Sequence, residues 1–202
     1  KYHQITALTS ETYRNDIETY LRKNPDKLRN THFVFVDVPH TSWHKGYRLE
    51  RLYYMFWQKK AAKVAKELCE KEQFDLIHHI TYVTCVLPTF MHELGIAFLL
   101  GPVAGGDLIP DCIGYPMNLK SKVFETVRHC SQRVFTSTPN FTKTVKPASL
   151  ILTATEDTAR LIPEKYRDKV DIFQAAGLQE HFFEPVPKHE QHDIPQFLMA
   201  GR

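Results

Sequence analysis

The sequence predicts an α/β protein with a doubly wound, mostly parallel sheet and helices on both faces of that sheet. Two observations predict this class. Short apolar runs such as "IAFLLGPV" (96–103) are hydrophobic on both faces, as strands buried inside a parallel sheet are. Between these runs lie longer segments whose apolar residues recur at helical spacing, so strands and helices alternate along the chain.

The first half of the chain is expected to hold two strands and two helices. The segments "YHQITAL" (2–8) and "THFVFVDVP" (31–39) contain β-branched and aromatic residues typical of strands. Between them, Thr9 or Ser10 can cap a helix. From 47 to about 72, apolar residues at helical spacing predict one long amphipathic helix.

The second half continues the alternation. Strands are expected at 74–81, 96–103, 148–155 and 169–177, and helices at 87–95, 117–135, 139–147 and 156–166. In sheets of this kind, ligands bind beyond the carboxyl ends of the strands. The turn "GPVAGGD" (101–107) and the segment "HHITYVT" (78–84) lie at such ends, so a candidate site is expected there.

Composition excludes several classes of protein. The 202 residues are 43% hydrophobic and 24% charged, which is typical of a globular chain and not of a disordered or fibrous one. A net charge of +3, without a known nucleic-acid-binding pattern, gives no reason to expect a nucleic-acid partner. The longest apolar runs are shorter than the roughly 20 residues of a membrane span, so we expect a cytoplasmic location.

The cysteine pattern suggests neither a metal site nor a redox pair. Cys69, Cys85, Cys112 and Cys130 are widely separated and have no histidine partner at zinc spacing. We therefore expect free thiols in a reducing compartment, with no metal and no cofactor.

The turn "GPVAGGD" holds three of the eight glycines of the chain. One interpretation is a tight loop that needs positive φ angles. The alternative is a site for an anion or a sugar hydroxyl, formed by backbone amides. The turn matches neither a Walker loop nor a GxGxxG fingerprint, so neither phosphate-binding motif is assigned.

Two further segments leave alternatives open. His78 and His79 point to opposite faces of a strand end, so they either orient a loop or leave His79, together with Thr81, facing a ligand. The basic and aromatic segment 45–66 either packs its aromatics in the core or lies on anionic lipid, which would make the protein membrane-associated.

Three segments, "FDLIHHITYVTCVLPTFMHELGIAFLLGPVAGGD", "ASLILTATEDTARLIP" and "FLMAGR", together resemble the group 1 (family 4) glycosyltransferases, in the branch with HHxT and GPVGGGE motifs. The likeness runs over nearly the whole chain. It implies one half of a GT-B enzyme, which has two Rossmann-like domains and transfers a sugar from a nucleotide-sugar donor with retention of configuration and no required metal. A glycan or lipid-linked acceptor is the expected partner.

The resemblance also implies a domain organisation. Residues 1–181 correspond to the N-terminal, acceptor-side domain, 182–195 to an interdomain linker and 196–202 to the start of the donor-binding domain. The family's first strand and Gly-rich loop would precede Lys1, and its donor-binding Glu motif would follow Arg202. The isolated chain is therefore expected to be inactive.

Within the branch motif, the sequence departs at two positions, with Ala104 for a glycine and Asp107 for the glutamate. Many relatives outside the branch also carry a histidine that faces the donor sugar where this strand ends in Gly101, Pro102 and Val103. The cleft is therefore expected to use His79, Thr81, Gly101, Pro102, Gly105, Gly106 and Asp107. The amides of Gly105 and Gly106 would replace the imidazole, and Asp107 would orient a hydroxyl. Gly105→Val in the complete enzyme is expected to reduce activity while leaving the fold largely intact.

Two other functions remain open. A nucleotide-sugar epimerase or dehydrogenase would carry a Tyr-xxx-Lys pair, and the candidate pair here is Tyr166 and Lys169, which has two residues between them instead of three. A non-catalytic domain derived from the transferase fold is the third possibility.

Overall fold

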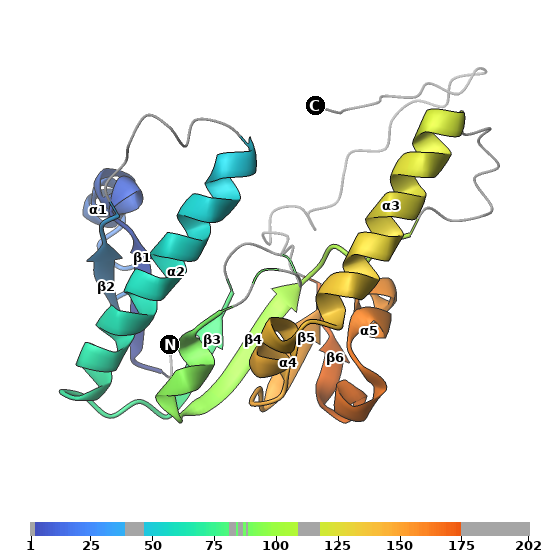
Figure 1. Cartoon of the computed structure of the whole chain (residues 1–202). Coiled ribbons are helices and arrows are strands. Elements are labelled where there is room, and N and C mark those ends of the chain that lie inside the picture. The colour runs from blue at the N-terminus through green and yellow to red at the C-terminus, as the bar shows by residue number, and fades with distance from the viewer. Residues whose placement is uncertain are drawn as a thin grey trace, which may run out of the picture.

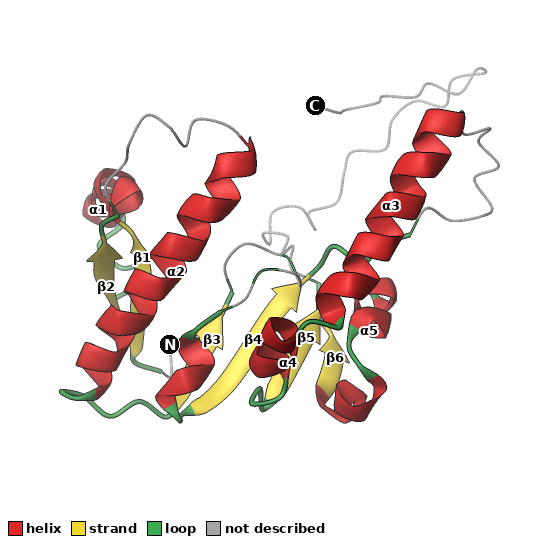
Figure 2. Cartoon of the chain, viewed as in Figure 1, coloured by secondary structure: helices red, strands yellow, loops and turns green. Residues whose placement is uncertain are grey.

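The computed structural model describes residues 3–38, 47–80, 84, 87, 89–108 and 118–174. Within them the chain is an α/β protein built on two parallel sheets (Figure 1). The larger sheet has four strands in the order β3-β4-β5-β6, and the smaller one pairs β1 with β2. Strands and helices alternate as the hydrophobic pattern predicts (Figure 2).

The strands are β1 (Ile5–Ser10), β2 (Thr31–Val36), β3 (Leu76–His79), β4 (Ala97–Val103), β5 (Leu150–Thr153) and β6 (Val170–Ile172). The α-helices are α1 (Arg14–Lys23), α2 (Tyr47–Cys69), α3 (Leu119–Thr136), α4 (Pro139–Val145) and α5 (Glu156–Leu161). Short 3₁₀ turns are η1 (Glu11–Tyr13), η3 (Met91–Leu94) and η5 (Glu164–Lys169). The predicted boundaries of 31–39 and 169–177 are therefore too long, because the regular strands end at Val36 and Ile172.

The prediction of one open sheet is only partly correct. All pairings are parallel, but β1 and β2 form a sheet of their own, and β1 has no ladder with β3 in the described residues. Figure 1 shows β1 and β3 as the neighbouring edges of the two sheets. Apolar side chains on these two strands remain open, since Ile5 is 51% and Leu76 53% exposed.

Helix α2 connects the two sheets through side chains. On one side, the Trp57 indole N–H donates to the carbonyl of Val36 in β2 at 3.3 Å. On the other, the Tyr54 hydroxyl lies 3.4 Å from Nε2 of His79 in β3. Trp57 is buried and stacks on Tyr54, so these two aromatics belong to the core, whereas Phe56 is 55% exposed. The core interpretation of segment 45–66 therefore holds for Trp57 and Tyr54.

Local sequence signals explain where several elements begin and end. Ser10 and Asn118 accept backbone N–H bonds at the starts of η1 and α3, as N-cap side chains do. Gly95 ends η3 with φ of +71°, the left-handed conformation common after helices. The helix predicted at 156–166 is instead two pieces, because Pro163 cannot continue the hydrogen-bond ladder of α5.

The core lies mainly against β4 and β5. Phe98, Val103 and Ile151 are almost fully buried there, and Phe141 and Val145 of α4 pack into the same cluster. This arrangement fixes the carboxyl end of β4, which carries the Gly-rich turn.

Candidate functional site

The Gly-rich turn leaves the sheet at the carboxyl end of β4. Gly101, Pro102 and Val103 are the last residues of the strand, and the peptide bond between Gly101 and Pro102 is cis. The pairing register between β4 and β5 shifts between Leu100 and Val103, so the ladder is irregular just before the turn. Pro102 is partly buried in β4 and is a strand residue here.

Gly101 is required for packing. Its φ is +113°, and a Cβ at this position would overlap the carbonyl oxygen of Leu152 in β5 and lie 2.9 Å from the Val103 nitrogen. The Gly101 carbonyl is 2.8 Å from Nε2 of His78, so the two predicted segments meet here. Sequence reasoning favoured His79 for the site, whereas His78 is the histidine that reaches the turn.

Gly105 and Gly106 have different environments. Gly105 has φ of +100° and is exposed, and a Cβ there would meet only Oγ1 of Thr84, at the ordinary contact distance of 3.8 Å. Its N–H donates to no acceptor within the described part of the chain. Gly106 is buried, and a Cβ there would lie 2.6 Å from Cα of Thr158. The main chain is therefore open at Gly105 and closed against α5 at Gly106.

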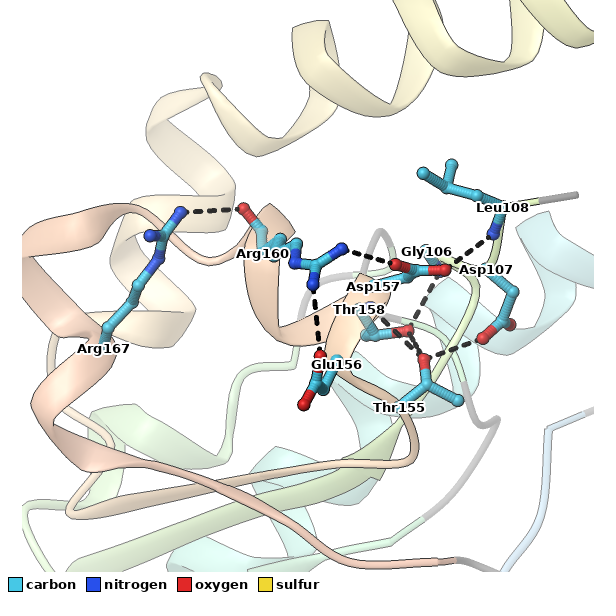
Figure 3. Close-up of polar contacts among 9 residues, drawn as sticks. All are labelled: Gly106, Asp107, Leu108, Thr155, Glu156, Asp157, Thr158, Arg160 and Arg167. Carbon is cyan, nitrogen blue, oxygen red and sulfur yellow. Dashed lines mark hydrogen bonds and ion pairs between the residues drawn. The ribbon is translucent and has the colours of Figure 1, made fainter. Parts of the chain in front are cut away.

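The amide of Gly106 is not available as expected, because it donates to Oγ1 of Thr158 at 3.1 Å (Figure 3). The Thr158 hydroxyl lies 3.0 Å from that of Thr155, and the Thr155 hydroxyl donates to Oδ1 of Asp107 at 2.7 Å. An ionised carboxylate only accepts, so the Thr155 proton points to Asp107 and the Thr158 proton to Thr155. The result is a directed chain of hydrogen bonds from Gly106 to Asp107.

Further bonds fix the end of the turn to α5. The N–H of Leu108 donates to Oδ2 of Asp157 at 3.1 Å, and Asp157 also accepts from Arg160 at 3.1 Å (Figure 3). Thr155 is in addition the N-cap of α5, as its position before Glu156 and Asp157 suggested.

Helix α3 holds the other side of the turn. Arg128 donates to the Asp107 carbonyl at 2.9 Å, and the Gln132 amide donates to the Gly105 carbonyl. Arg128 is itself oriented by Glu125 at 2.6 Å. The turn is thus attached on both sides. Two of its polar groups can still bind a ligand: the Gly105 N–H, which has no acceptor among the described residues, and the exposed carboxylate of Asp107.

The structure does not bring His79 to this turn. Its Nδ1 lies 3.3 Å from the hydroxyl of buried Thr89, and its Nε2 is directed at Tyr54 of α2. Burial, and secondarily the charge of His78, lowers the pKa of His79 to about 4, so the ring is neutral near pH 7. Thr81 lies outside the described residues, so its predicted place beside the turn is not described.

Several members of the site were not predicted from the sequence. Thr158, Arg128 and Gln132 come from helices and approach the turn only through the fold, whereas Thr155 was predicted solely as a cap. No local signal marks the first three, because the contact between Gly106 and Thr158 spans 52 residues.

The candidate pair of Tyr166 and Lys169 does not lie at this end of the sheet. Lys169 lies just before β6 and donates to the carbonyls of Lys146 and Ala148, which precede β5. This pair is therefore at the amino ends of the strands, opposite the Gly-rich turn.

The described residues contain no cluster of three or more histidine, cysteine or acidic side chains that could hold a metal ion. No helix among them combines the length and the hydropathy needed to cross a bilayer.

Comparisons with known proteins found no match. No protein-family model and no curated protein matches the sequence, and no solved structure matches the fold.

Proposed function

We propose that the chain is the acceptor-side, Rossmann-like half of a GT-B glycosyltransferase. In this proposal the enzyme transfers a sugar from a nucleotide-sugar donor to a glycan or lipid-linked acceptor with retention of configuration. The observation that carries the proposal is the turn at the end of β4, held by α3 and α5 so that Gly105 and Asp107 remain open. This is the edge of a parallel sheet at which ligands bind.

The two open groups have distinct chemistry in this proposal. The Gly105 N–H is a fixed donor that would stabilise a phosphate or sugar oxygen of the donor. The Asp107 carboxylate accepts one hydrogen bond from Thr155 and has further lone pairs for an acceptor hydroxyl. The resemblance implies that no metal or cofactor is required, so protein groups would stabilise the charge on the nucleotide leaving group.

The split sheet also supports this fold. β1 and β3 carry exposed apolar side chains and are neighbouring edges of two parallel sheets. One further parallel strand between them would join both into a doubly wound sheet. The resemblance expects such a strand in the segment before Lys1.

The test is turnover of UDP-, GDP- and dTDP-sugars by the enzyme that contains both halves, with nucleotide release followed by phosphorus NMR in the presence of an acceptor extract. We expect one donor to be consumed, and none to be consumed by residues 1–202 alone. If the complete, folded protein releases nucleotide from no donor, the transferase proposal is wrong and a non-catalytic domain is favoured.

A pair of variants tests the turn itself. Asp107→Asn keeps an oxygen that can accept from Thr155 but removes the charge, and we expect it to lower kcat/KM at least tenfold, about the value of one hydrogen bond to a charged group. Asp168→Asn makes the same change at an exposed position of η5 and should leave turnover unchanged. If both variants are equally active, Asp107 takes no part in the reaction.

A further inference from the structure

Helix α3 exposes an apolar stripe to solvent. Its members recur at helical spacing and are Leu119, Val123, Val127, Cys130 and Val134, here called the α3 stripe. Phe124 and Phe135 are also exposed, but at roughly 100° per residue they lie nearer to the face of Arg128 than to the centre of the stripe. The six residues other than the cysteine are between 50% and 78% exposed. Figure 1 shows the first half of the helix extending beyond the ends of the strands.

The stripe is on the opposite face of α3 from the candidate site. At roughly 100° per residue, its centre lies half a turn from Arg128 and Gln132, which hold the Gly-rich turn. Glu125, the only acidic residue of α3, lies on that inner face and is paired with Arg128. The stripe is therefore not needed for the contacts that fix the turn.

Cations border the stripe on both sides. Lys120 lies along one border, and Lys122 and Arg133 along the other. All three are exposed, and none forms an ion pair with another residue in the part of the chain that is described. An apolar centre between exposed basic side chains, without acids on the same face, is the pattern of a helix that lies in a membrane interface.

We propose that the α3 stripe docks on the surface of an anionic lipid bilayer, with its apolar side chains at the headgroup boundary and Lys120, Lys122 and Arg133 on the lipid phosphates. A second copy of this chain fits less well, because it would bring two cationic helix faces together. This proposal is independent of the transferase activity. It assigns lipid contact to α3, whereas the sequence had suggested the segment that forms α2, whose Trp57 is buried.

The first experiment measures flotation of the full 202-residue chain with vesicles of phosphatidylcholine alone or mixed with phosphatidylglycerol. We expect binding to the anionic vesicles only, weakened by added salt. A cation near an anionic surface contributes about a fivefold factor, so K120Q/K122Q/R133Q should weaken binding by about a hundredfold. The matched control, K60Q/K63Q/K66Q, removes the same charge from exposed positions of α2 and should change binding by less than a few fold.

A second pair of measurements tests the apolar side chains. Val123→Asp with Val127→Asp changes two exposed residues, so circular dichroism should report an unchanged fold while vesicle binding is lost. An environment-sensitive fluorophore on Cys130, in a chain without the other cysteines, should shift to the blue on binding. The same label at position 60 of α2 should not shift.

Three outcomes would overturn the proposal. The first is that the folded chain does not float with anionic vesicles. The second is that the α2 control loses binding as strongly as the α3 variant. The third is a concentration-dependent dimer, without vesicle binding, that the double aspartate variant dissociates, since the stripe would then be a contact between two copies. None of these results depends on nucleotide-sugar turnover, so a failure of the membrane proposal leaves the proposed function unaffected.

Discussion

The buried position of His79 predicts that the stability of the protein decreases in mild acid. The pKa of His79 is lowered from 6.5 to about 4, first by burial and then by the charge of His78. The unfolded chain therefore takes up a proton at a higher pH than the folded chain does. Below pH 6.5 the unfolded state gains protons first, so the free energy of unfolding falls until the folded ring also titrates near pH 4.

The size of the effect follows from the two pKa values. At pH 5, with 6.5 for the unfolded and about 4 for the folded state, the loss relative to pH 8 is about 2 kcal/mol. Over the whole window from pH 8 to below 4, it reaches about 3 kcal/mol. A domain of this kind has only about 5–15 kcal/mol of stability, so the change is readily measured.

The assay is urea denaturation followed by circular dichroism at several values between pH 4.5 and 8, for the natural chain, His79→Gln and the control His32→Gln. Glutamine does not titrate, so His79→Gln should flatten the slope between pH 5 and 6.5 even if it lowers stability at every pH. His32 is exposed on β2, and its replacement should leave the slope intact. If the natural chain and His79→Gln lose stability equally on acidification, His79 is not the group responsible and the reasoning fails.

Five other substitutions, at four positions, test the packing of the turn and the core. Gly101→Ala places a Cβ on the Leu152 carbonyl and should prevent stable folding. Gly105→Ala meets no steric overlap and should cost about 1–2 kcal/mol for its positive φ, as urea denaturation of both variants can show. Thr158→Val leaves the Gly106 N–H without an acceptor and should cost about 1–3 kcal/mol of stability. Thr158→Ser keeps the hydroxyl and should retain most of the stability. Equal losses in the two variants would contradict the hydrogen-bond chain. Ile151→Ala opens a cavity in the fully buried centre of β5, and we expect the free energy of unfolding to fall by about 2–5 kcal/mol in the same assay. A fall of less than about 1 kcal/mol would contradict the tight packing of Ile151.

The sequence predicted the order of elements well because their signals are local. Apolar runs located each strand of the larger sheet, and the caps at Ser10, Thr155 and Gly95 are found where their side chains or backbone freedom suggested. The break at Pro163 was missed because the helical spacing continues through it. The signal for the break is the proline itself, which has no N–H to donate to the helix ladder.

The details of the site could not be predicted, because they depend on contacts distant in sequence. Glycines at 105 and 106 look equivalent in the sequence, yet one faces solvent and the other packs against Thr158. The expectation that Gly105→Val would spare the fold is also weakened, since a β-branched side chain is strained at φ of +100°. Which of two adjacent histidines reaches the turn depends on the pleat and on the position of α2.

The absence of a shared ladder between the two sheets has a consequence for cooperativity. In the described residues, β1 and β2 hydrogen-bond to each other, and α2 links them to β3 through side chains such as Trp57 and Tyr54. Opening this pair breaks side-chain packing but no strand pairing of the larger sheet, so it can occur as a separate subglobal step. Amide hydrogen exchange should therefore give two opening free energies, one for β1 and β2 and a higher one for β4 and β5.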